Sequence, residues 1–555
     1  ELLRILQERA RGLGVDLRFG HEVGDLAAFA GYDLIVAADG VNSLVRRELT
    51  EALRPSVHTG RSRFIWLGTT KAFDALTFLF EESEHGWFGV HAYPYSAAAS
   101  TFIVETDEAT WRRAGFERYA EAALAPGASD AHSVAYCQAL FARHLNGHAL
   151  LANNSKWLNF RTVRSRLWHA GNAVILGDAA HTAHFSVGSG TRMAIEDAIA
   201  LARALADHTD LESAFAAYER ERQPAVRRIQ EAAEPSRRWW ENFRHWTHFG
   251  AEQFAFHHLA RTRLLTYGIL KVRDGRAVRD VETWFARSNG ARAARKPVAA
   301  GRPATVSPLS TALRLRDVRF PNRLVEMAAG VLDEWEEGPD AMGMGKSRTR
   351  IEGAGLMLVA SPRAGAGKPI RPRTRVPVGL YLHTRPDESI AGYVRLARSA
   401  ARAGFDLLAI KCAPSPPALA MLAAVRKAWP ARRPLCAHIA AWSDPENDRL
   451  AEAGLEFARA LKARGADVVA VSGPVGSMRT LERARIAQIY TSDLIRNIVG
   501  LPTMVIGGRY NVGDVTALIL AGRTDMCGWP ALAWPGWRPG LGPAAAGRPG
   551  VGSRV

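Results

Sequence analysis

Residues 172–205 constrain the fold more than any other part of this chain, because the signals of a strand, a loop and a helix follow one another there. The segment NAVILGDAAHTAHFSVGSGTRMAIEDAIALARAL opens with an apolar run, residues 173–176, that ends at Gly177 and Asp178. After the loop, apolar residues recur at helical spacing. Backbone N–H groups at such a strand-to-helix loop favour negative or polar ligand groups. The segment therefore predicts a strand–loop–helix unit with a ligand at its loop.

Three residues of this loop are candidates for ligand contact. Gly188 and Gly190 would let the backbone approach a flat or phosphorylated ligand closely. The carboxylate of Asp178 could accept hydrogen bonds from the hydroxyls of a sugar or ribityl chain. A second interpretation stays open, in which Asp178 is a helix cap or turn residue and the glycines only serve the turn.

Another strand–loop–helix segment lies earlier in the chain. In DLIVAADGVNSLVRREL, residues 33–49, an apolar strand ends at Asp39 and Gly40, and Ser43 is placed to cap the helix that follows. One dinucleotide bound from two sides would require two such strand–carboxylate–glycine units. The pair of motifs predicts that the two loops meet.

Composition sets limits on the class of protein. The 555 residues are enough for more than one domain, and 47% hydrophobic with 23% charged residues is ordinary globular composition. The four cysteines are too widely spaced for a zinc site and too few for a disulfide framework, which fits a reducing cytoplasm. The cysteine spacing leads us to expect no metal site. We also expect no membrane span, since no apolar run reaches 18 residues.

The formal charge of +17 admits a nucleic acid, a membrane surface or an anionic small molecule as a partner. Arginines are scattered among alanines on predicted helices, as in residues 219–238, without a nucleic-acid-binding motif. We therefore expect a solvated basic face and no specific nucleic acid, with phosphate binding as a secondary hypothesis.

The chain divides at a Pro/Ala/Arg-rich stretch, residues 291–310, which has linker composition. Before it, residues 1–290 combine the two motif units with a β-rich middle. After it, residues 311–535 alternate short apolar strands with amphipathic helices, which favours a barrel on a parallel sheet. That stretch is shorter than the about 250 residues of a usual (β/α)8 barrel. A Gly/Pro-rich tail, residues 536–555, is expected to be disordered.

The pair AADGVNSLVR and VILGDAAHTAHFSVGSG resembles the two flavin motifs of the aromatic hydroxylase family of FAD monooxygenases. The resemblance implies an α/β fold in which a Rossmann-like FAD/NAD(P)-binding domain precedes a shortened TIM-type barrel. It implies FAD as the cofactor, with NAD(P)H and O2 as the reactants that reduce and reoxidise it, and leaves the catalytic residues unknown. The implied FAD contacts are Asp39, Gly40, Arg46, Gly177, Asp178, Gly188, Ser189, Gly190 and Thr191.

The sequence around His181 and His184 resembles one branch of this family, which acts on aromatic acyl-CoA thioesters. That branch comprises the salicylyl-CoA 5-hydroxylases and the 2-aminobenzoyl-CoA monooxygenase/reductases. That branch carries an old-yellow-enzyme-like barrel, which residues 313–325 and the later strands resemble. The resemblance implies an aromatic acyl-CoA substrate and a partial FMN phosphate cradle at Gly507, Gly508 and Gly528. A loop histidine near a flavin is more often a packing or hydrogen-bonding group than a base, so we assign proton transfer to neither histidine.

The sequence departs from this pattern at two places. No G-x-G-x-x-G loop precedes Asp39, so we expect an amino-terminally incomplete FAD fold. In the barrel, Lys411 and Pro414 replace the family's histidine pair, and His438 stands where a flavin-contacting Arg is expected. The barrel is therefore expected to be an impaired reductase, and a flavin-free scaffold or non-functional remnant is the alternative. Homo-oligomerisation is left open.

Two other motifs are rejected. The segment DAMGMGKS, residues 340–347, has Asp340 where a phosphate loop needs its first Gly. No G-x-S-x-G elbow surrounds Ser186 or Ser189, which argues against a serine hydrolase.

Overall fold

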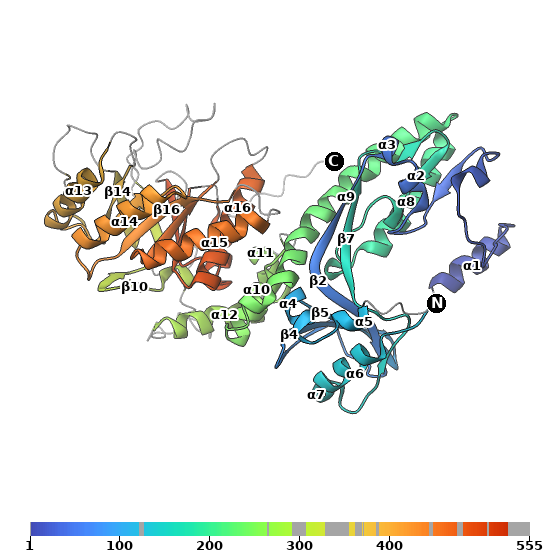
Figure 1. Cartoon of the computed structure of the whole chain (residues 1–555), viewed down its shortest axis with the longest axis horizontal. Helices are drawn as coiled ribbons and strands as arrows, with labels where there is room; N and C mark the ends of the chain where they lie inside the picture. Colours follow the sequence, from blue (N-terminus) through green and yellow to red (C-terminus); the bar gives the residue numbers. More distant parts are fainter. Residues whose placement is uncertain are drawn as a thin grey trace, which may run out of the picture. The chain divides into compact units, whose positions relative to one another are not determined.

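A computed structural model of the chain shows two compact units, residues 1–244 and 245–555 (Figure 1). Within the described ranges, no helix combines the length and the apolar content needed to cross a membrane. The structure describes residues 2–120, 127–262, 266–290, 307–327, 354–360, 369, 371–383, 388–442, 448–473, 481–507 and 510–530.

The first unit contains a small sheet built from the two sequence motifs. Its strand order is β1-β9-β8, with β1 and β9 parallel and Ala37 opposite Ile175. Both predicted apolar runs are therefore strands, and both predicted helices follow them. The elements are β1 (Ile35–Ala37), α2 (Leu44–Glu48), β8 (His169–Ala170), β9 (Ala173–Ile175) and α8 (Gly190–Asp207).

The β-rich middle predicted from the sequence forms a larger antiparallel sheet. Its order is β3-β4-β5-β2-β6, and β7 also pairs with β2. The apolar side chains of one face join helices to make a core around Phe88, Phe102 and Trp111. The strands are β2 (Pro55–Thr69), β3 (Thr77–Ser83), β4 (Gly86–Ser96), β5 (Ala99–Thr106), β6 (Leu150–Leu151) and β7 (Leu158–Ser165). The helices near this sheet in sequence are α4 (Glu108–Arg113), α5 (Glu117–Ala120), α6 (Ala131–Leu140) and α7 (Ala142–Leu145).

The long helix α9 (Leu211–Asn242) packs on both sheets of this unit and runs beside β2 in Figure 1. Near its start, Phe215 and Tyr218 are buried in the core of the small sheet. Near its end, the ring of Trp240 stacks on Phe80 of β3 at 5.5 Å between centroids. Because one continuous helix contacts both sheets, it fixes the small sheet relative to the large one.

The second unit is a closed barrel of eight parallel strands in chain order. Five strands, from β14 to β18, are each followed by a helix before the next strand. The closed parallel barrel was predicted; its identity as a (β/α)8 TIM-type barrel stays a prediction. The strands are β12 (Leu324–Met327), β13 (Leu356–Ala360), β14 (Val378–Leu382), β15 (Leu407–Lys411), β16 (Leu435–Ala440), β17 (Val468–Ser472), β18 (Thr503–Ile506) and β19 (Met526–Pro530). The intervening helices are α13 (Ile390–Arg402), α14 (Pro416–Ala428), α15 (Asp448–Ala463), α16 (Leu481–Leu494) and α17 (Val512–Leu520).

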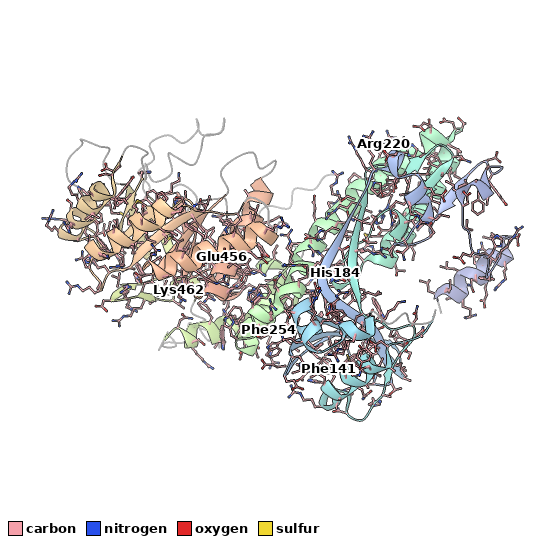
Figure 2. All side chains as sticks on the ribbon, in the orientation of Figure 1. Phe141, His184, Arg220, Phe254, Glu456 and Lys462 are labelled. Carbon is pink, nitrogen blue, oxygen red and sulfur yellow. The ribbon has the colours of Figure 1, made fainter. Side chains whose placement is uncertain are left out.

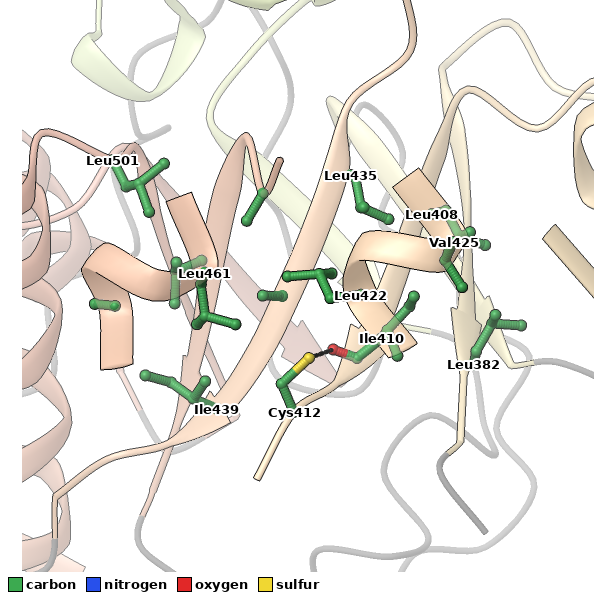
Figure 3. Packing of buried hydrophobic residues seen from close by; sticks show 14 of the residues in the cluster. Leu382, Leu408, Ile410, Cys412, Leu422, Val425, Leu435, Ile439, Leu461 and Leu501 are labelled. Carbon is green, nitrogen blue, oxygen red and sulfur yellow. Dashed lines mark hydrogen bonds between the residues drawn. The ribbon is translucent and has the colours of Figure 1, made fainter. Parts of the chain in front are cut away.

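Alternation along the barrel strands explains their almost continuous apolar sequence. In β15, Leu408 and Ile410 face the surrounding helices and pack with Leu422 of α14 (Figure 3). Leu407 and Ala409 belong instead to the cluster inside the barrel. Successive strand residues point to opposite faces, so a strand covered on both sides needs apolar residues at every position.

Three helices within the predicted domain of residues 1–290 pack in the second unit. They are α10 (Ala251–Leu259), α11 (Tyr267–Arg273) and α12 (Gly275–Ser288). Their buried side chains, such as Phe256 and Phe285, share a core with Val515 and Ile519 of α17. The predicted domain limits stay a prediction, because residues 291–306 and 531–555 lie outside the described residues. The segment 340–347, rejected as a phosphate loop, also lies outside them.

Candidate functional site

The loops that follow β1 and β9 meet at one edge of the small sheet. The two strands are parallel, and the backbone N–H of Leu176 donates to the carbonyl oxygen of Ala37 at 3.0 Å. Carboxyl ends of parallel strands share an edge, so Asp39 and Gly40 lie on the same side as Gly177 and Asp178.

Arg46 ties these loops together from inside the protein. Its guanidinium donates to the carbonyl oxygens of Ala179 at 2.6 Å, of Asp178 at 3.4 Å and of Val41. Arg46 is only 7% exposed, and this burial lowers its pKa. Arg46 therefore positions both loops through backbone carbonyls.

Asp39 and Ser43 organise the start of α2. One carboxylate oxygen of Asp39 accepts from the backbone N–H of Leu44 at 2.7 Å. The hydroxyl of Ser43 accepts from the backbone N–H of Arg46 at 3.0 Å, which confirms the predicted cap. Capping orients the helix and presents Gly40, with φ +79°, at the loop surface.

Asp178 lies in a 3-10 turn, η2 (Gly177–Ala179), as the turn interpretation predicts. Its side chain is exposed, and among the described residues no donor is bonded to its carboxylate. Loss of surrounding water raises the pKa of Asp178. The carboxylate does not cap the turn, so both of its oxygens can accept from a ligand.

Glycines of both loops leave open space beside the backbone. A Cβ placed on Gly40, Gly188 or Gly190 would meet no atom within 4 Å. Gly188 has φ +62°, and Ser189 is the N-cap residue of α8, whose first turn contains Gly190 and Thr191. The first N–H groups of a helix have no partner within it. Open glycines, helix N–H groups and an acceptor carboxylate fit the ring, phosphates and hydroxyls of a flavin dinucleotide.

Gly177 packs closely against α8. It has φ +56°, and a Cβ there would lie 3.1 Å from Cβ of Ala194 in α8. A side chain at this position would push the helix away from the loop.

His181 is part of a buried ionic network behind the loop, as the packing interpretation predicts. Its Nε2 lies 2.7 Å from Asp197, which also accepts from the backbone N–H of Gly177 and from Nε of Arg222 at 2.8 Å. Burial opposes the charge of Asp197, yet these partners hold its pKa below the usual range. Sequence reasoning missed Asp197 and Arg222, whose only signal is a charged residue on the apolar face of a helix.

His184, labelled in Figure 2, faces a buried carboxyl group of the large sheet. Its Nε2 lies 3.7 Å from Glu105 of β5, which accepts from the hydroxyl of Ser62 at 2.7 Å and contacts Nε2 of His91 at 3.2 Å. Burial raises the pKa of Glu105 to about 7 and lowers the pKa of His184 to about 4. No sequence motif marks Glu105 or His91, and only the sheet brings them to His184.

The barrel places a hydrogen-bonded chain where the sequence predicts a flavin-contacting residue. Nδ1 of His438 in β16 lies 2.6 Å from the hydroxyl of Tyr381, and Nε2 lies 3.0 Å from the hydroxyl of Ser472. Burial, with Lys411 and His383 nearby, lowers the pKa of His438 to about 3. Lys411 lies opposite His438 in the strand register.

The predicted phosphate cradle of the barrel is only partly described. Gly507 has φ +74°, and Gly508 lies outside the described residues. A Cβ on Gly528 would lie 2.9 Å from Cγ2 of Ile506 and 3.1 Å from the sulfur of Met327. The side of Gly528 where a Cβ would stand is therefore filled by strand neighbours.

Residues 31–233, which contain both motif loops, match the family described as FAD binding domain. The chain belongs to the FAD-binding monooxygenase family. It is 35% identical over 268 residues to protodeoxyviolaceinate monooxygenase of Chromobacterium violaceum, covering 48% of this chain and 69% of that protein.

Two further relatives are more similar over their matched regions. Salicyloyl-CoA 5-hydroxylase of Streptomyces sp is 44% identical over 346 residues, which are 62% of this chain and 63% of that protein. The 3-hydroxy-4-methyl-anthranilyl-[aryl-carrier protein] 5-monooxygenase of Streptosporangium sibiricum is 40% identical over 238 residues, 43% of this chain and 61% of that protein. The chain thus spans less than two thirds of the length of each.

Proposed function

We propose that this chain is an FAD-dependent, NAD(P)H-driven hydroxylase of an aromatic acyl-CoA, of the salicylyl-CoA or 2-aminobenzoyl-CoA type. The observation that carries the proposal is the junction at Arg46, which holds both motif loops at one sheet edge. Two relatives are named for oxygenation of an aromatic acyl group attached to CoA or to a carrier protein.

The residues that would hold FAD follow from the loop geometry. Asp178 would accept hydrogen bonds from the ribityl hydroxyls, and residues 188–191 would lie beside the isoalloxazine ring. Asp39 and Gly40 would lie near the pyrophosphate. When bound and reduced, FAD supplies the activation of O2 that aromatic hydroxylation needs. The protein orients the ring and excludes water.

The acyl-CoA part of the proposal rests on the basic character of the chain together with the relatives. Charge-assisted hydrogen bonds from arginine are suited to phosphate groups, and the chain has a formal charge of +17. Arginine side chains would contact the CoA phosphates.

We further propose that the barrel is old-yellow-enzyme-like and impaired as an FMN reductase. Lys411 and Pro414 stand in place of a histidine pair, and His438 is buried and neutral. The strand neighbours that fill the side of Gly528 support the same proposal.

The test is the visible absorption spectrum of the purified chain after soaking in FAD or FMN, alone or with salicyloyl-CoA, followed by desalting. Retained FAD absorbance, and NAD(P)H oxidation that depends on salicyloyl-CoA and forms a hydroxylated product, would support the proposal. A chain that stays colourless in every mixture would refute it and favour the flavin-free scaffold.

A further inference from the structure

We propose that Glu105, His184 and Ser186 form a proton relay that removes the proton of the ring hydroxyl when the aromatic substrate binds. The inference rests on the proposed function, and it gives a role to a buried carboxyl–imidazole pair that the FAD site does not use. Ser186 would contact the substrate hydroxyl. Glu105 and His184 act on the substrate only through Ser186 and are therefore positioning residues.

The inner end of the relay is a carboxyl group enclosed by strands. Glu105 is 0% exposed, and its two oxygens face Ser62 of β2, His91 of β4 and His184. A buried carboxyl group that can be neutral or charged near physiological pH can store one proton.

The hydrogen bonds of His184 fix the direction of transfer. Its Nδ1 accepts from the backbone N–H of Ser186 and lies 2.7 Å from the Ser186 hydroxyl. A neutral imidazole with an accepting Nδ1 carries its proton on Nε2, the atom that faces Glu105 at 3.7 Å. The Ser186 hydroxyl also lies 2.7 Å from the hydroxyl of Ser236 in α9.

The outer end of the relay lies beside aromatic side chains. Phe185, between His184 and Ser186, contacts Phe64 at 5.0 Å and Trp66 at 5.9 Å between ring centroids. Trp66 is 46% exposed, and Ser186 is half-buried. Aromatic rings that border a partly open surface favour a planar aromatic ligand.

Charged side chains of helix α9 influence the proton affinities of Glu105 and His184. Arg237 faces both Glu105 and His184, but it is ion-paired with Glu234 and Glu241 of its own helix. The positive charge of Arg237 is thus largely balanced locally, and Glu105 keeps a high proton affinity.

The transfer balances without any added reactant. The O–H bond of the ring hydroxyl breaks, and its proton passes to the Ser186 oxygen while the Ser186 proton passes to Nδ1 of His184. The Nε2 proton of His184 then passes to the Glu105 carboxylate, as the 3.7 Å separation shortens to hydrogen-bond distance. The ring oxygen keeps the electron pair, which makes the ring more electron-rich.

The first measurement needs no ligand. Infrared difference spectra of the full chain between pH 6 and pH 8 should show a protonated carboxyl band that fades with a midpoint near 7 and is absent in Glu105→Gln. Ser62→Ala, which removes a hydrogen bond that favours the charged form, should move the midpoint to higher pH. A Glu105 midpoint near the ordinary 4.5 would overturn the proposal.

The second measurement uses salicyloyl-CoA with the FAD-loaded chain at pH 8, and benzoyl-CoA, which lacks the hydroxyl, as the control ligand. In the wild-type protein, bound salicyloyl-CoA should be in its phenolate form. A pH-indicator dye in weakly buffered solution should detect no released proton, because the protein retains it. Ser186→Ala should lower the phenolate fraction at least tenfold, and it remains informative where Glu105→Gln does not fold. Equal phenolate fractions in wild type and Ser186→Ala would overturn the relay, whereas absence of salicyloyl-CoA binding would overturn the proposed function itself.

Discussion

The guanidinium of Arg46 donates to the carbonyl oxygen of Ala179 at 2.6 Å, although the two residues are 133 positions apart in the chain. This bond joins the loop after β1 to the loop after β9. An arginine can contact several carbonyl oxygens at once because its planar head offers five donors in a fixed arrangement. The pairing of β1 with β9 brings the two loops to one edge, and the Arg46 side chain joins them there.

Replacing Arg46 by lysine should loosen both loops, because a single ammonium cannot reach all three carbonyl oxygens. We expect FAD affinity to fall by about 1.5–3 kcal/mol, the energy of one hydrogen bond to a charged group. Flavin fluorescence quenching during titration with FAD measures the change. Arg47→Lys, on the exposed side of the same helix, should bind FAD like the wild type. Equal affinity in the two variants would show that Arg46 does not position the site.

Replacing Gly190 by alanine tests the open cradle. The added methyl group meets no protein atom within 4 Å, so the melting temperature should not fall. A flavin ring packed against the loop would be displaced, and we expect FAD affinity to drop at least about tenfold, or 1.4 kcal/mol. The matched control is Gly268→Ala in α11, where a Cβ also meets nothing within 4 Å. Unchanged FAD affinity in Gly190→Ala would place the flavin elsewhere.

Replacing Asp178 by alanine should reduce FAD affinity by about 1.5–3 kcal/mol while leaving stability unchanged, since the carboxylate is exposed. The raised pKa of Asp178 also predicts a pH dependence. The affinity contributed by the ionised carboxylate is present above that pKa and is lost as the pH falls through it. Asp178→Asn should abolish this dependence in FAD titrations between pH 4 and pH 8. A persistent pH dependence in Asp178→Asn would assign it to another group.

Replacing Asp197 by alanine should destabilise the first unit by about 3–5 kcal/mol, because His181 and Arg222 would remain buried without their partner. Differential scanning calorimetry of the full chain should show the loss in one transition. The lowered pKa of Asp197 means that its contribution is present above the unfolded-state pKa and disappears as the pH falls through the folded-state value. Glu196→Ala removes a more exposed partner of Arg222 and should cost less than about 1 kcal/mol. Equal losses in both variants would contradict this account.

Replacing His438 by arginine restores the residue type expected at a flavin site, yet it should destabilise the barrel. The new charge would be buried opposite Lys411, and we expect a loss of about 3 kcal/mol or more in thermal unfolding. His438→Gln, which stays neutral and can still hydrogen-bond Tyr381, should lose less. A stable His438→Arg variant that retains FMN after desalting would refute the impaired barrel.

Local sequence signals were sufficient for the elements and for the exposed part of the candidate site. Apolar runs ending in Asp-Gly or Gly-Asp predicted β1 and β9, and the turn residues predicted the loops that contain Asp178 and Gly188. Alternating strands and helices predicted the closed parallel barrel. These features succeed because strand length, helix periodicity and turn chemistry are encoded within a few neighbouring residues.

The sequence by itself thus determined which segments are strands, loops and helices, and it marked the loop residues that form the candidate site. Only the tertiary structure decided that Arg46 joins two loops, that Asp197 anchors His181 and that Glu105 faces His184. Those partners come from separate elements, and their proton affinities depend on burial. Burial is a property of the packed chain, and no local pattern carries it.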